Sequence, residues 1–493
     1  MESKKYRVEI FAGVFVFAMM FVFFSEAHPI VMFDGDDWGT ISESRPALPK
    51  WGAWNPIKVL PETLYPSVGF FSAYFVAPFV GDYLTAFTIS AAAIVSIFIT
   101  AYIFLMILFL EKNFSLQRSA AIFLGLMFLL LHFAIFLQHD EFQNEYLFQV
   151  IDTTCYFHYL IPALLNASLV LLLSQIDTTK NFFSQADGKK ILLVFAVYMA
   201  IFSNVLHSSI LAIYIFVELL WKIRPKDFSP KKFFQENKFY CLILIFWSVS
   251  LIFEINGGRS HNLAKNIDTS FFENFISAAA AYFQSLAHNN RGAAFFIIAI
   301  VTVPFVWKNS ADEFAEKILT AIKKFALCLP IWSLYTILAG AKAGIDYAVR
   351  RDVQIGIFFF LFVIVISAFA YWLKKNPHSM LIFPILIFAL FTWTCSGTKN
   401  FAASNVKHLP EKTCQEINRY IVNELVAADK SGAEEFILLL PKWNDADNWP
   451  HPIYMGERYI RTLYSHGIIS RQFKVTVEPD ENLNKNFGLK GGE

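Results

Sequence analysis

Charged residues are scarce in this chain: they make up 16% of its 493 residues, while 56% are hydrophobic and 55 are phenylalanine. A soluble protein carries roughly a quarter charged residues, so the composition excludes an ordinary soluble domain. The five cysteines show no C-x-x-C or other paired spacing, so neither a disulfide framework nor a thiolate metal site is indicated. No internal repeat is visible, which weighs against a transporter built from repeats.

Long apolar runs take the place of the missing charge. The clearest run, residues 84–110, exceeds the ~20 residues that cross a bilayer. The predicted fold class is therefore an all-α polytopic membrane protein. Hydropathy predicts about eleven transmembrane helices, near residues 8–25, 84–110, 119–137, 156–174, 191–205, 207–221, 239–254, 293–307, 325–340, 355–373 and 380–396.

Lysine and arginine are concentrated in alternate loops, and this bias sets the expected orientation. Lys4, Lys5 and Arg7 place the N-terminus in the cytoplasm, and the basic loops then share that side, at 111–118, 175–190, 222–238, 308–324 and 374–379. The outer face receives the loops 26–83, 138–155, 255–292 and 341–354 and the tail 397–493. Counting the short apolar stretch 67–81 as a span would invert this pattern. Residues 54–81 are therefore predicted to lie in the outer interface of the bilayer.

Two domains follow from this pattern. Residues 1–396 are predicted to form the membrane module, in which 26–83 is the first outer loop. Residues 397–493 are predicted to form a small α/β domain outside the membrane, with a helix over 417–430 and strands over 434–440 and 471–479. Residues 4–27 also resemble a signal peptide, whose removal leaves the orientation of the rest unchanged.

An acidic cluster follows the first predicted helix, in the stretch "DGDDWG" with Asp34, Asp36 and Asp37. One interpretation is a solvated turn, because Asp and Gly are common turn residues. The other is catalytic: carboxylates at a membrane surface lose hydration, which raises their pKa toward the range of a general base. A second acidic cluster, "QHDEFQNEY" with Asp140 and Glu141, is expected on the same side.

Two outer loops carry cations that the orientation rule does not explain. "NGGRSHNLAKN" holds Arg259 and His261, and "KAGIDYAVRRDV" holds Arg350 and Arg351. Arginine is suited to bidentate contacts with phosphate, whereas the alternative is pairing with nearby aspartates or lipid headgroups. Outer acids together with outer cations suit a lipid-phosphate sugar donor, attacked by a hydroxyl in a single inverting displacement.

The acidic motif in the first outer loop, the interfacial segment behind it and the soluble tail together resemble the GT-C glycosyltransferases. The "DGDDWG…RP" stretch is similar to bacterial enzymes that decorate O-antigen or wall polysaccharides using undecaprenyl-phosphate sugars. The resemblance implies a hexosyltransferase in the bacterial plasma membrane, with a polyprenyl-phosphate sugar donor and a polysaccharide or glycolipid acceptor. It implies no nucleic-acid partner and no cofactor, although the Asp34-x-Asp36 spacing leaves a divalent ion as an alternative.

The resemblance also assigns roles to residues. The base maps onto Asp36 or, preferably, Asp37, and a second acid onto Asp140 or Glu141. The donor phosphate falls to Arg259, His261, Arg350 or Arg351, with no choice among them. Acceptor contacts are expected from Trp38, Arg45 and, in the tail, Trp449, although the aromatic residues of the tail could equally form the core of a small domain.

Other functions stay open. A polysaccharide polymerase or ligase also has about a dozen helices and cationic outer loops, but usually carries its catalytic residues late in the chain. A lipid-linked sugar flippase or transporter needs charged residues deep within its spans, and the spans here read as mostly uncharged. A membrane scaffold leaves the clustered acids unexplained.

Overall fold

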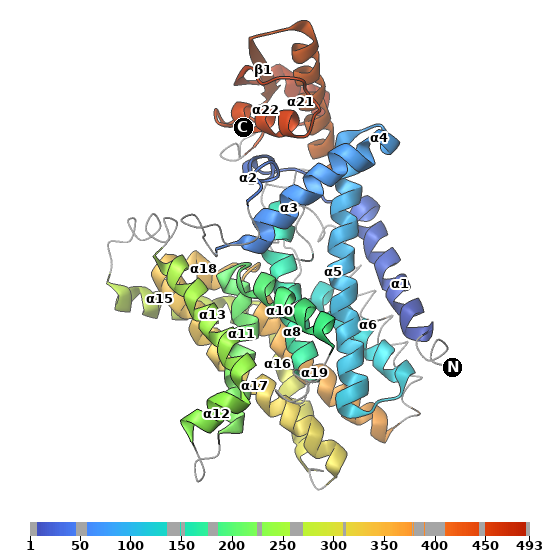
Figure 1. The fold of residues 1–493 in the computed structure, drawn as a ribbon, viewed down its shortest axis with the longest axis vertical. Coiled ribbons are helices and arrows are strands. Elements are labelled where there is room, and N and C mark those ends of the chain that lie inside the picture. Colours follow the sequence, from blue (N-terminus) through green and yellow to red (C-terminus); the bar gives the residue numbers. More distant parts are fainter. Residues whose placement is uncertain are drawn as a thin grey trace.

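The computed structural model describes residues 7–45, 57–135, 148, 153–175, 186–223, 229–256, 270–308, 312–376, 378, 389, 410–442 and 449–489. Helices dominate this part of the chain, and long apolar helices form most of the molecule (Figure 1). By length and composition, eight of the described helices could cross a membrane, or nine if one bent pair is counted as a single span. The prediction of an all-α polytopic membrane protein is confirmed at this level.

The helical bundle is built from long helices and a few short ones. Its members are α1 (Arg7–Val22) continued by η2 (Phe23–Ala27), α5 (Tyr83–Phe114), α6 (Arg118–Ala134), α8 (Ile161–Leu173), α10 (Asp187–Ile201), α11 (Val205–Lys222), α12 (Pro230–Glu236), α13 (Lys238–Ile255), α15 (Phe271–His288), α16 (Asn290–Lys308), α17 (Glu313–Ala343), α18 (Asp346–Val349) and α19 (Ile355–Lys375).

Shorter elements gather at the top of the bundle as drawn in Figure 1. From the N-terminal half come α2 (Gly35–Thr40), α3 (Val59–Phe71), η3 (Ser72–Val76), α4 (Ala77–Val80), α7 (Thr153–Cys155) and η4 (Tyr156–Leu160). Above them lie the C-terminal elements α21 (Glu411–Ser431), β1 (Glu435–Pro441), α22 (Met455–Ser465), β2 (Lys474–Asp480), α23 (Glu481–Asn484) and η8 (Lys485–Phe487).

Two predicted loops are helical instead. The segment 308–324, predicted as a basic loop, is mostly the first part of α17, which begins after the N-cap Asp312 and carries a Glu313–Lys317 ion pair of 2.7 Å on its first turns. Helix α15 lies inside the predicted loop 255–292 and starts with a capping box of Ser270 and Glu273. Hydropathy did not select these segments as spans because charged residues lower their hydropathy, among them Glu273 in α15 and Glu313, Lys317 and Lys324 in α17.

The remaining predicted spans overlap helices of the structure, except for 380–396, which lies outside the described residues apart from Ala389. Helix α15 meets α16 at a bend of 82°. The exact number of spans, and the side on which each loop lies, therefore stay predictions.

The segment predicted to lie in the membrane interface forms a single run of helix, Val59–Val80, that is long and apolar enough to cross a membrane. Figure 1 shows it running obliquely across the end of α5, beneath the C-terminal elements. The Tyr74 hydroxyl donates to the Ser465 carbonyl at 3.0 Å. Gly69 leaves room for Ile41 and His466, which would lie 2.6 and 3.0 Å from an added Cβ. One face of this helix therefore contacts the first loop and the C-terminal elements, while Phe75 and Phe79 remain exposed.

The bundle interior contains one ion pair that the sequence did not suggest. Lys324 on α17 donates to both carboxylate oxygens of Glu218 on α11, at 2.8 and 2.9 Å, and the Tyr214 hydroxyl donates to the same carboxylate at 2.7 Å. Glu218 lies in the predicted span 207–221, whereas Lys324 lies in the predicted loop 308–324, so this pair could not be recognised within the predicted spans. Three hydrogen bonds from two donor groups compensate part of the cost of burying this carboxylate.

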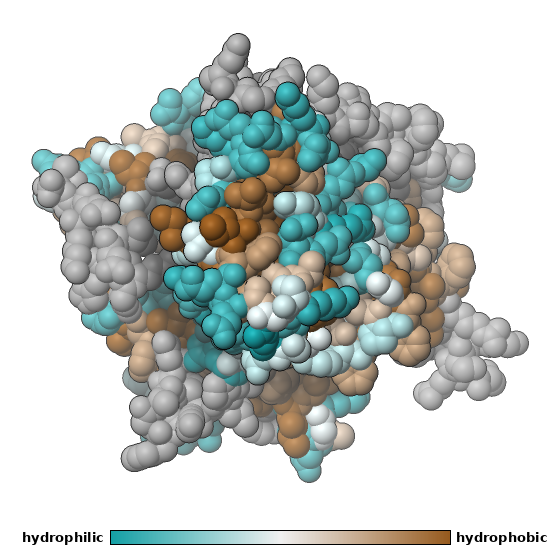
Figure 2. All heavy atoms as spheres, turned by 90° about the horizontal axis from the view of Figure 1, so that it is seen from above, coloured by the Kyte–Doolittle hydropathy of each residue, from teal (hydrophilic) through white to brown (hydrophobic). Residues whose placement is uncertain are grey.

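The described C-terminal elements, called the C-terminal unit below, comprise helices and a two-stranded sheet. Strands β1 and β2 pair in parallel, from Glu435 opposite Lys474 to Pro441 opposite Asp480, and α22 lies in the connection between them. Seen from above, this end of the molecule shows a hydrophobic patch surrounded by hydrophilic residues (Figure 2). The unit is joined to the bundle by buried contacts, including Tyr83 Oη to His466 Nδ1 at 2.7 Å.

Helix α22 packs closely on strand β2 at Gly456. A Cβ at this position would lie 2.3 Å from the backbone oxygen of Val475, which cannot move without disturbing the strand. We expect Gly456→Ala to lower the melting temperature of the detergent-solubilised protein, at a cost of about 1–3 kcal/mol.

Gly188→Ala is the matched control, because nothing lies within 4 Å of the added methyl and alanine favours helix. Equal melting temperatures for Gly456→Ala and wild type would contradict this packing.

Candidate functional site

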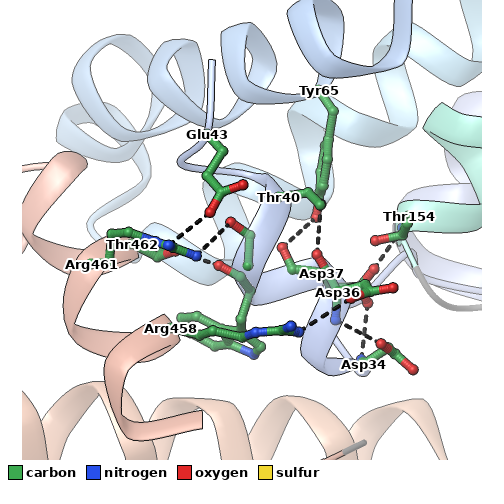
Figure 3. Close-up of polar contacts among 12 residues, drawn as sticks. Asp34, Asp36, Asp37, Thr40, Glu43, Tyr65, Thr154, Arg458, Arg461 and Thr462 are labelled. Atoms are coloured by element: carbon green, nitrogen blue, oxygen red, sulfur yellow. Dashed lines mark hydrogen bonds and ion pairs between the residues drawn. The ribbon is translucent and has the colours of Figure 1, made fainter. Parts of the chain in front are cut away.

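The acidic motif forms a short helix, α2, whose start is organised by two of its own aspartates. The Asp34 carboxylate caps the helix by accepting from the Asp36 amide at 2.7 Å, and Asp37 completes a capping box with it. Figure 3 shows these side chains at one end of α2. The turn reading of "DGDD" is thus partly correct, because this is capping chemistry.

Asp37 anchors the motif to a distant part of the chain. Its carboxylate accepts from at least four backbone amides: Phe33 at 2.8 Å, Asp34 at 3.1 Å, Thr153 at 3.3 Å and Thr154 at 2.6 Å. The side chain is fully buried. The preferred sequence assignment of Asp37 as the base conflicts with this geometry, because no surface of the carboxylate is open to an acceptor hydroxyl.

Asp36, the preceding residue, faces the C-terminal unit. Its side chain is 68% exposed and pairs with Arg458 of α22 at 3.2 Å (Figure 3). One turn further along α22, Arg461 pairs with Glu43 at 2.7 Å and donates to the Gly39 carbonyl at 3.3 Å. The acidic stretch is therefore also a docking surface for two arginines of the tail.

Trp38 and Trp449, predicted to contact the acceptor, are core residues of this region. The Trp38 ring packs edge-on against Tyr459 at 4.9 Å, and the Trp449 ring lies 5.4 Å from that of Phe33. Their exposed fractions are 0% and 1%. Neither ring can stack on a sugar in this conformation.

The Arg45 side chain contacts the end of the first loop and the start of α3. Its guanidinium donates to the Ile57 carbonyl and pairs with Glu62 of α3 at 3.0 Å. The contact ties the end of the loop to the start of α3, so the geometry gives Arg45 a structural role.

Asp34 has the features expected of a proton acceptor. It is partly exposed, so a hydroxyl can reach it. Burial and the neighbouring carboxylates of Asp37 and Asp36 raise its pKa to about 7, against the lowering effects of the Asp36 amide and of Arg458. A base with a pKa near the operating pH combines ionisation with proton affinity. The sequence grouped Asp34 with its neighbours but did not select it.

The predicted phosphate-binding cations have different surroundings. Arg350 pairs with the buried Asp352 through two contacts, one of them at 3.1 Å, and packs over the rings of Tyr159 and Tyr347 at 5.5 and 5.4 Å. The open alternative, pairing with a nearby aspartate, is thus correct for Arg350. Arg351 is the next residue and is partly buried. Arg259, His261, Asp140 and Glu141 lie outside the described residues.

A cavity of about 270 Å³ opens beside Arg350, lined mostly by apolar surface. Its charged lining residues are Lys58, Lys342 and Glu254. Tyr159 and Tyr347, whose rings contact the Arg350 guanidinium, also line it. Lys58 has a left-handed backbone with φ of 57°, which is uncommon for a residue other than glycine. A mostly apolar cavity with two lysines and one glutamate at its wall suits a molecule with a hydrocarbon part and a polar head, and the excess of positive charge favours an anionic head.

Two helices connect this cavity to the acidic motif. Lys58 precedes α3, and seven residues later the Tyr65 hydroxyl donates to the Asp37 carbonyl at 3.0 Å. Seven residues of helix rise by about 10 Å. Thr154, which binds Asp37, precedes Tyr159 of the cavity wall by little more than one helical turn. The motif and the cavity are thus neighbours at the same end of the bundle.

Metal ligands are not gathered near the motif. Among the described residues, no group of three or more His, Cys, Asp or Glu side chains could hold a metal ion. Asp34 and Asp36, the two carboxylates of the D-x-D spacing, are engaged with the α2 amide and with Arg458 respectively.

Comparisons with protein-family models, with curated proteins and with solved structures find no match to this chain. The chemistry of the site is therefore interpreted from its own geometry.

Sequence reasoning missed Lys58 and Arg458. Arg458 and Arg461 are three residues apart on a helix, so they share one face, and this basic face could have been paired with an acidic partner. Nothing local identifies α2 as that partner, because Asp36 and Arg458 are separated by 422 positions.

Replacing Asp37 tests its anchoring role. In Asp37→Asn one acceptor oxygen becomes an NH₂ group that faces backbone amides, so we expect a loss of about 1–3 kcal/mol or more. Asp36→Asn is the matched control: an exposed ion pair contributes at most about 1 kcal/mol. Thermal unfolding of the two purified variants measures the difference, and equal melting temperatures would show that Asp37 is not an anchor.

Proposed function

We propose that this chain is an integral-membrane glycosyltransferase of the GT-C type, which moves a sugar from a polyprenyl-phosphate donor to a polysaccharide or glycolipid acceptor. It would act in the bacterial plasma membrane, on the extracytoplasmic side. The observation that carries the proposal is the partly exposed Asp34 carboxyl at the same end of the bundle as an apolar cavity lined by lysines.

The cavity supplies the donor site. The hydrocarbon chain of the donor would lie against its apolar wall, which α11, α13 and α17 provide. Lys58 and Lys342 would bind the phosphate, because an ammonium donates charge-assisted hydrogen bonds to phosphate oxygens. Arg350, held by Asp352, keeps the two tyrosine rings of the wall in place. The predicted phosphate-binding role of Arg350 is thus revised to a supporting one.

Asp34 supplies the proton acceptor. The acceptor hydroxyl loses its proton to Asp34 as its oxygen bonds to the anomeric carbon of the sugar. The bond from that carbon to the phosphate oxygen breaks, and its electron pair leaves with the polyprenyl phosphate. A single displacement of this kind inverts the anomeric configuration. The two lysines stabilise the negative charge that builds on the phosphate.

A second candidate function, transport of a lipid-linked sugar, is favoured by one observation. The Glu218–Lys324 pair lines another cavity, of about 410 Å³, together with Asn113 and Ser174 at the far ends of α5 and α8. Charged residues within spans commonly mark transport pathways. If the chain is a transporter, Glu218→Gln abolishes its activity and Asp34→Asn does not.

Sugar transfer should depend on the ionised form of Asp34. We expect Asp34→Asn to lower the release of polyprenyl phosphate from a panel of polyprenyl-phosphate hexoses by at least a hundredfold, the lower range for loss of a general base. Wild-type activity should rise with pH through about 7, because the carboxyl must be deprotonated.

Asp82→Asn is the matched control, since Asp82 also caps a helix at this end and asparagine caps as well as aspartate. Equal loss in both variants, or full activity of Asp34→Asn, would contradict the base assignment.

Donor binding should depend on the lysines of the cavity. We expect Lys342→Gln to weaken binding of undecaprenyl phosphate in detergent by about tenfold or more, because a charge-assisted hydrogen bond contributes about 1.5–3 kcal/mol. Lys317→Gln is the control: Lys317 is exposed, pairs with Glu313 and lies outside this cavity. Unchanged affinity in Lys342→Gln, measured by calorimetry, would remove the donor site from this cavity.

A further inference from the structure

Resting on the proposed role of Asp34, we propose that Arg458 is a positioning residue for this carboxyl. Through its contact with Asp36, it favours the ionised form of Asp34 only while α22 is docked on α2. The C-terminal unit is then part of the site, because it supplies the cation that prepares the base.

The contacts run from α22 to Asp34 in two steps. Arg458 Nη1 lies 3.2 Å from an Asp36 carboxylate oxygen, and the Asp36 amide donates to Asp34 at 2.7 Å. The guanidinium is held over Gly39, where an added Cβ would lie 3.2–3.3 Å from its atoms, and 4.6 Å from the Tyr454 ring. A ring and a bare backbone thus fix the cation beside the motif.

The charges around Asp34 explain why this cation matters. Burial raises the pKa of Asp34 to about 7, together with repulsion from the carboxylates of Asp37 and Asp36 in the adjoining helix α2. From α22 the charged group that acts on it is Arg458, which lowers the pKa, while the neighbouring α7 presents backbone amides to the motif. Removing Arg458 takes away the positive charge that acts against this repulsion and leaves the Asp36 amide as the opposing contact, so Asp34 takes up a proton at a higher pH.

Arg461 offers a control in the same interface. It lies one turn from Arg458 on α22, contacts the same helix α2 through Gly39, and pairs with Glu43 at 2.7 Å. It is not among the charges that shift the pKa of Asp34. Loss of either arginine weakens docking, but only loss of Arg458 changes the ionisation of Asp34.

The experiment measures Asp34 ionisation without requiring catalysis. Full-length wild type, Arg458→Gln and Arg461→Gln are each purified with and without Asp34→Asn, and melting temperatures are recorded from about pH 4 to pH 9. An acid whose folded pKa exceeds its unfolded value of 3.8 destabilises the protein as pH rises. In wild type, this loss of stability is absent below about pH 4 and reaches its full size above about pH 7.

With Arg458→Gln, the pH range over which the melting temperature differs from that of the Arg458→Gln, Asp34→Asn double variant should extend to higher pH than in wild type. Arg461→Gln should keep the pH range seen in wild type, and Arg458→Lys should restore that pH range. If Asp34→Asn changes the melting temperature over the same pH range in Arg458→Gln and in Arg461→Gln, the inference is overturned.

The activity of the same proteins gives a second readout. A higher pKa reduces the ionised fraction of Asp34 at pH 7, so donor turnover by Arg458→Gln should fall below that of wild type at pH 7 and recover as the pH is raised. If wild type shows no donor turnover, the proposed function fails, while the melting data still decide the role of Arg458.

Discussion

The Asp37 carboxylate is the interaction on which the upper part of the molecule depends. It accepts hydrogen bonds from backbone amides of the first loop and from those of Thr153 and Thr154 at the start of α7. These two threonines follow Asp37 by 116 and 117 positions in the sequence. A buried carboxylate is stable only when its oxygens are satisfied, so this one fixes the backbone around it. The position of Asp34, and the surface that α2 presents to α22, follow from that anchor.

The three aspartates of the motif therefore have three different tasks. Asp37 holds the loop, Asp36 binds the tail, and Asp34 is left partly exposed with a pKa suited to proton transfer. Gly39 and Trp38 belong to the same interface, since the first admits the Arg458 guanidinium and the second packs on Tyr459. One short stretch thus unites capping, docking and the proposed chemistry.

The sequence was a good guide to helices and a poor guide to the site. Apolar length was enough to predict the span 84–110, and periodicity was enough for the helix and strands of the tail. Choosing among Asp34, Asp36 and Asp37 required knowing that Thr154 binds one and Arg458 another, and no local pattern encodes such distant contacts. Charge counting missed the start of α17 because it treats Lys317 and Lys324 as solvated loop residues, whereas each is paired with a glutamate.

The central claim is that a lipid phosphate binds in the cavity of Lys58 and Lys342 with its head toward Asp34. An electron cryomicroscopy structure of the full chain in a lipid nanodisc with undecaprenyl phosphate tests it most directly. The account predicts phosphate density between the two lysines, at the end of the cavity nearest Tyr65 and the acidic motif. Phosphate density beside the Glu218–Lys324 pair, with the lysine-lined cavity empty, would contradict it.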